Sequence, residues 1–75
     1  MDKKSQARAL VERLTPSELA ALCSVAAGES VPHLARRLSI GIAVAAEIKG
    51  SMKHKLGAVR DADAVRVALY AGMDE

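Results

Sequence analysis

Aromatic residues are nearly absent from this chain of 75 residues, which has no Phe, no Trp and a single Tyr at position 70. The core must therefore be built from Leu, Ile, Val, Met and Ala, which bury less area per residue than aromatic side chains do. Such a length allows one domain, and a domain this small buries only about 60% of its unfolded surface. Oligomerisation is the usual compensation for so small a core, and we expect it here.

Cysteine is also scarce, since Cys23 stands alone and no disulfide can form within the chain. The lack of a disulfide framework favours a reducing compartment. Leu22 and Val25 beside it predict a buried thiol that packs as a small hydrophobic residue. No apolar run approaches the ~20 residues that span a bilayer, and the N-terminus lacks the apolar core of a signal peptide. We therefore expect a soluble, cytoplasmic protein without membrane contact.

The residue types that carry enzyme chemistry are present without the necessary groupings. His33 and His54 have no Cys or paired carboxylates at metal-ligand spacing. No Ser, His and Asp arrangement points to a nucleophile, and the glycines stand singly rather than in a phosphate-binding loop. The sequence therefore predicts neither an enzyme nor a bound cofactor or metal.

Positive charge gathers in the middle of the chain. The net charge is only +2, but residues 31–60 hold six basic residues and one acidic residue, Glu47, for a net charge of +5. The remaining residues hold five basic and eight acidic side chains, for a net charge of −3. This distribution suits contact with a polyanion, although a solvated helix surface would look similar.

Apolar spacing and capping signals predict helices throughout. A first amphipathic helix is expected over residues 3–13. Thr15 and Glu18 form a capping box around Pro16, and Gly28 ends the helix that follows. Ser30 caps a short helix over residues 31–38, and a turn at 39–41 leads into a longer helix over 42–56 that Gly57 ends. Asp61 is expected to cap a last helix over residues 62–71, so the fold class is all-α.

A short helix, a tight turn and a longer helix make up the helix-turn-helix unit, whose second helix enters the major groove of DNA. The chain resembles the LuxR/GerE-type helix-turn-helix domain from residue 14 onward. The resemblance is carried by residues 14–18 (LTPSE), 25–28 (VAAG), 34–40 (LARRLSI), 55–57 (KLG), 61–66 (DADAVR) and 71–72 (AG). The expected organisation is an N-terminal helical extension over residues 1–13 and a four-helix domain of this type over residues 14–75.

The resemblance implies a DNA-binding transcription regulator that dimerises through its last helix, here of the free-standing kind because the chain has no room for a sensor domain. The residues expected at double-stranded DNA are Arg36, Arg37, Val44, Glu47, Lys49, Lys53, His54, Lys55 and Arg60. Those expected at the dimer interface are Val65, Leu69 and Tyr70, although burial within the monomer would also explain an apolar last helix. Arg36 and Arg37 could instead pair with Glu18 or with other nearby acids.

The front of the expected recognition helix departs from the family pattern. The family usually places Thr, a basic residue and often His where this chain has Val44, Ala46 and Ile48, and Ser17 replaces a basic residue in the opening motif. Val and Ala donate no side-chain hydrogen bond, so direct base readout reduces to contact with thymine methyl groups. We therefore expect weak, salt-dependent DNA binding of low specificity.

A second hypothesis follows from the same residues. The stretch over residues 42–46 is apolar, and an exposed apolar patch often marks a protein contact, so the domain could bind a protein partner at residues 42–47, as an anti-activator does. The N-terminal helix could also cover this stretch. If Leu10, Val11 and Leu14 pack on Val44, access to DNA is blocked, and if they pack on the last helix, the stretch stays open.

Overall fold

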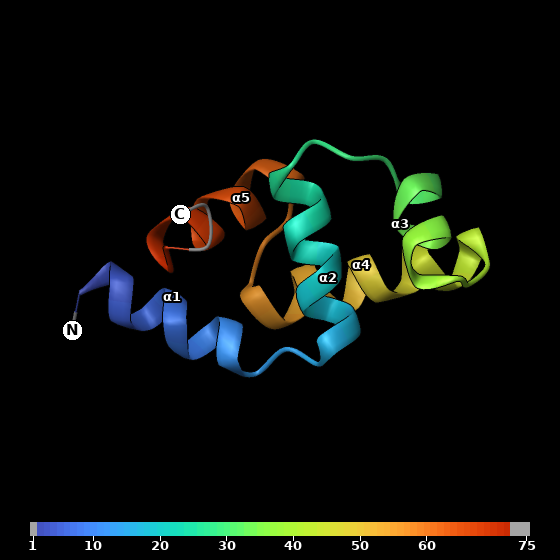
Figure 1. The fold of residues 1–75 in the computed structure, drawn as a ribbon. Helices are drawn as coiled ribbons and strands as arrows, with labels where there is room; N and C mark the ends of the chain where they lie inside the picture. The colour runs from blue at the N-terminus through green and yellow to red at the C-terminus, as the bar shows by residue number, and fades with distance from the viewer. Residues whose placement is uncertain (1, 73–75) are drawn as a thin grey trace.

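The computed structural model describes residues 2–72, and this part of the chain contains five helices and no strand. The all-α fold class is thus confirmed. The helices follow one another in the order α1 (Lys3–Glu12), α2 (Pro16–Ala26), α3 (Val31–Leu38), α4 (Ile42–Leu56) and α5 (Asp61–Tyr70) (Figure 1). Helices α2, α3 and α4 begin and end where the capping signals predict. Helix α1 ends one residue earlier than expected, and α5 begins and ends one residue earlier.

Side-chain caps explain where two of these helices begin. The Thr15 hydroxyl accepts from the Glu18 N–H at 3.2 Å, and the Glu18 carboxylate accepts from the Thr15 N–H at 2.8 Å. This reciprocal pair is the predicted capping box at the start of α2. The predicted cap of α3 is present as well, since the Ser30 hydroxyl accepts from the His33 N–H.

The prediction that Asp61 caps the last helix is wrong. Arg60 is the residue that precedes α5, and its N–H donates to the Asp63 carboxylate at 3.1 Å. Asp61 is instead the first residue of the helix, and its side chain turns to the lysines of α4. Asp63 therefore supplies the cap, and Asp61 is left to make contacts with α4.

The core lies where α2 packs against α3, α4 and α5 (Figure 1). Leu22, Leu34 and Met52 are its largest fully buried apolar side chains, and Ala21, Ala45 and the alanines of α5 let the helix backbones approach closely. The predicted burial of Cys23 is wrong, since this residue is exposed. Successive residues of a helix are about 100° apart, so Cys23 points away from the side on which Ala21, Leu22 and Val25 face the core.

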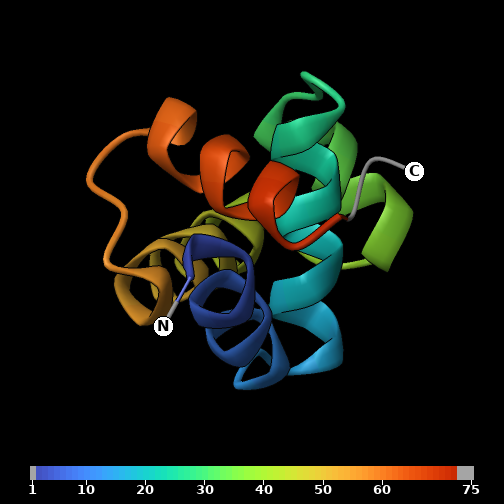
Figure 2. The same cartoon turned by 90° about the vertical axis from the view of Figure 1, so that its left-hand side faces the viewer.

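Helix α1 packs mainly on α5 and lies far from α3 (Figures 1 and 2). Ala7 is the buried residue of α1, and Leu10, Val11 and Leu14 are partly buried against the core. The Lys3 ammonium lies 5.5 Å from the centre of the Tyr70 ring, which adds a cation–π contact to the α1–α5 pair. The N-terminal helix therefore leaves the beginning of α4 uncovered, which was the second of the two predicted arrangements.

Candidate nucleic-acid interface

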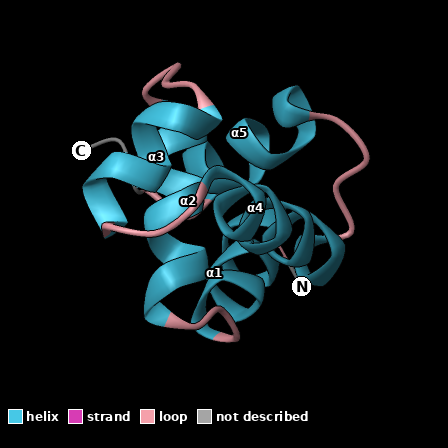
Figure 3. Cartoon of the chain, turned by 90° about the vertical axis from the view of Figure 1, so that its right-hand side faces the viewer, coloured by secondary structure: helices cyan, strands magenta, loops and turns pink. Residues whose placement is uncertain are grey.

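The turn between α3 and α4 is held by backbone hydrogen bonds and by one apolar anchor. Ser39 adopts a left-handed conformation with φ 56°, and the Ile40 N–H donates to the Ala35 carbonyl at 2.9 Å. This pattern closes α3, and the Ile40 side chain packs against the core. Gly41 then precedes α4 without a side-chain cap. The turn thus fixes α4 beside α3 at the end of the molecule that Figure 3 turns toward the viewer.

Helix α4 buries one face and presents the other. Ala45, Met52 and Leu56 lie in the core, with Ile48 partly buried beside them. More than half of the helix is exposed, namely Ile42, Ala43, Val44, Ala46, Glu47, Gly50, Ser51 and His54. The helix is therefore a surface rod with a free outward side, as docking into a groove requires.

The first half of that outward side is apolar and small. Ile42 is 58% exposed and Val44 is 46% exposed, with Ala43 and Ala46 exposed between and beyond them. Glu47 is the only charged residue in this half. Neither Ile, Val nor Ala offers a hydrogen-bond donor to a base edge, so this half of the helix provides shape and methyl contacts only.

Helix α3 brings two arginines to the surface next to α4. Arg37 pairs with Glu29 at 2.9 Å, and the same carboxylate oxygen lies 3.3 Å from the His33 ring. Arg36 is exposed and has no ion-pair partner among residues 2–72. Of the two alternatives for these arginines, Arg37 meets a nearby acid and Arg36 keeps its guanidinium available to a phosphate.

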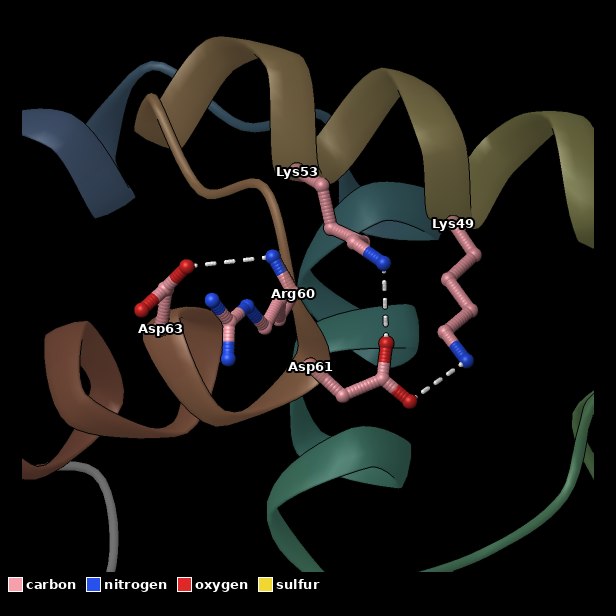
Figure 4. Close-up of polar contacts among 5 residues, drawn as sticks. All are labelled: Lys49, Lys53, Arg60, Asp61 and Asp63. Carbon is pink, nitrogen blue, oxygen red and sulfur yellow. Dashed lines mark hydrogen bonds and ion pairs between the residues drawn. The ribbon is translucent and has the colours of Figure 1, made fainter.

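Two lysines of α4 converge on one carboxylate at the start of α5. Lys49 donates to Asp61 Oδ2 and Lys53 donates to Asp61 Oδ1, both at 2.9 Å (Figure 4). The hydrogen bond from Lys49, followed by that from Lys53, lowers the pKa of Asp61 below its usual value. Arg60 stands beside this cluster, and within the described residues its guanidinium makes no ion pair. The structure therefore gathers Lys49, Lys53 and Arg60 near one acid that sequence reasoning did not connect with them.

Lys55 is engaged on the other side of α4. Its ammonium donates to Glu18 Oε1 at 2.7 Å, while the Ser51 hydroxyl donates to Glu18 Oε2 at 2.6 Å. Glu18 is only 5% exposed, and the bond from Lys55, then that from Ser51, then the Thr15 N–H lower its pKa to about 2. Lys55 therefore ties α4 to the start of α2, and its charge is already balanced.

The residues expected at a dimer interface have mixed positions on α5. Leu69 and Tyr70 are exposed, whereas Val65 is partly buried against the core. The contact of α1 with α5 takes up part of this helix, including one face of the Tyr70 ring. Leu69 and Tyr70 therefore form an exposed apolar patch at the end of α5.

The described residues contain no cluster of three His, Cys, Asp or Glu side chains suited to a metal ion. Within the same range no helix has the length and apolar character needed to cross a bilayer. Comparison of the chain with family models, with curated proteins and with solved structures gives no significant match in any of the three. The function must therefore be argued from the residues themselves.

Proposed function

We propose that this protein is a DNA-binding transcription regulator of the LuxR/GerE helix-turn-helix type, in which α4 enters the major groove and α3 braces it. The sequence resemblance from residue 14 onward supports this proposal, and so does the succession of a short α3, a three-residue turn and a longer α4. The Glu18–Lys55 ion pair also links residues 14–18 to residues 55–57, which are two of the blocks that carry the resemblance.

The uncovered outward side of α4 is the observation that carries the proposal. The helix is anchored by Ala45, Met52 and Leu56. The exposed residues on its opposite side make no side-chain hydrogen bond or ion pair with another element within residues 2–72, and they are Ala43, Ala46, Glu47, Gly50 and His54. At Gly50 an added Cβ would find no atom within 4 Å. Small residues on this side allow the helix backbone to approach a groove floor closely.

The same side chains limit what α4 can read. Its first half lacks donors for base edges, so affinity depends on phosphate contacts from Arg36 and from the lysines further along. Contacts of this kind give a Kd on the order of 1–100 µM at physiological salt and a steep salt dependence. The expected regulator binds DNA weakly and with little sequence preference.

A charge placed on α4 tests this docking. We expect Val44→Arg to lower the Kd for generic duplex DNA and to steepen the slope of log Kd against log salt by about 0.9, the value for one more phosphate contact. Leu19→Arg is the matched control, because Leu19 is an exposed apolar residue on α2, outside the proposed interface, and the gain in net charge is the same. Fluorescence anisotropy at several salt concentrations measures both variants. Equal effects of the two substitutions, or no binding by any form, would reject the proposal.

A second candidate function rests on the exposure of Ile42 and Val44. Two branched apolar side chains with alanines around them form a patch that a protein partner with an apolar helix or groove could cover. In that case the domain keeps its fold and uses residues 42–47 for a protein contact. The DNA measurement separates the two candidates, since a protein-binding patch gives Val44→Arg no advantage in DNA affinity over Leu19→Arg.

A further inference from the structure

The cluster of Lys49, Lys53 and Asp61 has the geometry of an occupied anion site. The two lysines lie one helical turn apart on α4, and each ammonium holds a different oxygen of the carboxylate at 2.9 Å (Figure 4). A carboxylate presents two oxygens that share one negative charge. A phosphodiester also presents two unesterified oxygens that share one negative charge, so the same two ammonium groups can hold it.

The exposure of the three groups shows which of them can be replaced. The lysine side chains are 21% and 23% exposed, whereas that of Asp61 is 53% exposed. Of the three side chains, that of Asp61 is therefore the one most open to solvent.

The cluster is not required to begin α5. Asp63 supplies that cap by accepting from the Arg60 N–H, and Asp61 bonds only to the two lysines among the described residues. Ion pairs with one partner this exposed contribute little to stability in water. The main effect of Asp61 is thus electrostatic, because its carboxylate lowers the net charge of the cluster from +2 for the two lysines alone to +1.

We propose that Lys49 and Lys53 form a phosphodiester-binding pair, and that Asp61 occupies this pair in the free protein until a DNA phosphate takes its place. Asp61 therefore acts as an intramolecular competitor that lowers DNA affinity. This inference rests on the proposed function, because it assigns a DNA contact to two residues of the same interface. It adds a phosphate site and a built-in restraint to that interface.

Replacing Asp61 by Asn tests the competition. We expect Asp61→Asn to bind generic duplex DNA roughly eightfold more tightly at 0.1 M salt, with a log–log salt slope steeper by about 0.9. Asp63→Asn is the matched control, because it gives the same net charge two residues away and frees no lysine. In a Lys49→Gln/Lys53→Gln background, Asp61→Asn should change the Kd by less than about twofold, because its effect acts through the lysines. Anisotropy titrations measure all of these forms, and circular dichroism with a thermal melt verifies that each is folded.

The outcomes separate this inference from the proposed function. If wild type binds DNA and Asp61→Asn gains no more than Asp63→Asn, the competition is wrong and the proposed function stands. The same conclusion holds if Asp61→Asn still raises DNA affinity in the Lys49→Gln/Lys53→Gln background, because the gain would then be a general charge effect. If neither wild type nor any variant binds DNA, the proposed function and this inference both fail.

Discussion

Glu18 connects two segments that lie 37 residues apart in the chain. Its carboxylate completes the capping box of α2 and also receives Lys55 and Ser51 from α4. The sequence showed the capping role, because capping boxes have a fixed local spacing. The bonds to α4 could not be predicted from spacing, because they depend on how two distant helices pack. The buried acid is thus the polar link between the start of α2 and the end of α4.

This link predicts a defined dependence of stability on pH. The folded protein holds the pKa of Glu18 at about 2, against 4.5 for the free side chain, so folding favours the charged form. The resulting stability is fully present above pH 4.5 and is lost as the pH falls toward 2. Urea unfolding between pH 2 and 6 should show this loss. Glu18→Gln should be less stable than wild type at pH 6, and the difference should shrink as the pH falls. The exposed Glu12→Gln serves as control, and a difference between Glu18→Gln and wild type that does not vary with pH would contradict the account.

Gly50 lies in the middle of α4, where nothing in the fold requires a glycine. A Cβ at this position meets no atom within 4 Å, so Gly50→Ala should raise the free energy of unfolding by about 1 kcal/mol, the difference in helix propensity. Gly57 is the matched control, since its φ of +67° is left-handed and Gly57→Ala should lower stability by about 1 kcal/mol. Chemical denaturation measures both. Destabilisation by Gly50→Ala would contradict the open outward side of α4, because the added methyl group would then meet other atoms of the protein.

At the scale of helices, the turn between α3 and α4 decides how α4 is presented. Ser39 is the one residue other than glycine that has a positive φ within residues 2–72, and it stands between the end of α3 and the Ile40 anchor. A serine tolerates this conformation better than a β-branched residue does. We expect Ser39→Val to lower the free energy of unfolding by about 1–2 kcal/mol and Ser39→Gly to be tolerated. Equal melting temperatures for the two variants would show that the turn is not constrained in this way.

The helices themselves were largely predictable because their signals are local. Thr15, Ser30, Gly28 and Gly57 mark helix ends by their own conformational preferences, and the structure agrees at each of them. The start of α5 was misplaced by one residue, because Asp61 is an intrinsically good cap and its real partners lie on another helix. Local signals therefore locate the helices, whereas the ion pairs between helices depend on packing.

At the scale of the whole molecule, the distribution of surface charge differs most from what the sequence predicts. Residues 31–60 have a net charge of +5, but four of their cations are paired with acids from outside that segment. The three acids are Glu18, Glu29 and Asp61, which lower the local net charge from +5 to +2. The net charge counted over residues 31–60 could not predict this neutralisation, because Asp61 lies one residue after that segment and the two glutamates lie before it. The basic surface is therefore weaker than the sequence predicted, and we expect any binding to DNA to be correspondingly weak.

Assembly is the second question at this scale. We expect a symmetric dimer through α5, beside the surface that α1 covers, because the core is small and Leu69 and Tyr70 are exposed. Sedimentation equilibrium at tens of micromolar should give the mass of a dimer, and Leu69→Lys should shift it toward the monomer. Glu12→Lys, an exposed charge change on α1, is the control. A monomeric wild type at this concentration would contradict the dimer.

The most direct test of the central claim is a two-dimensional NMR titration of the protein with generic duplex DNA at low and high salt. The account predicts that amide shifts gather on α3 and on the exposed side of α4, from Arg36 to His54, and that they disappear at high salt. Shifts confined to α1 and α5, or no shifts at either salt concentration, would contradict it.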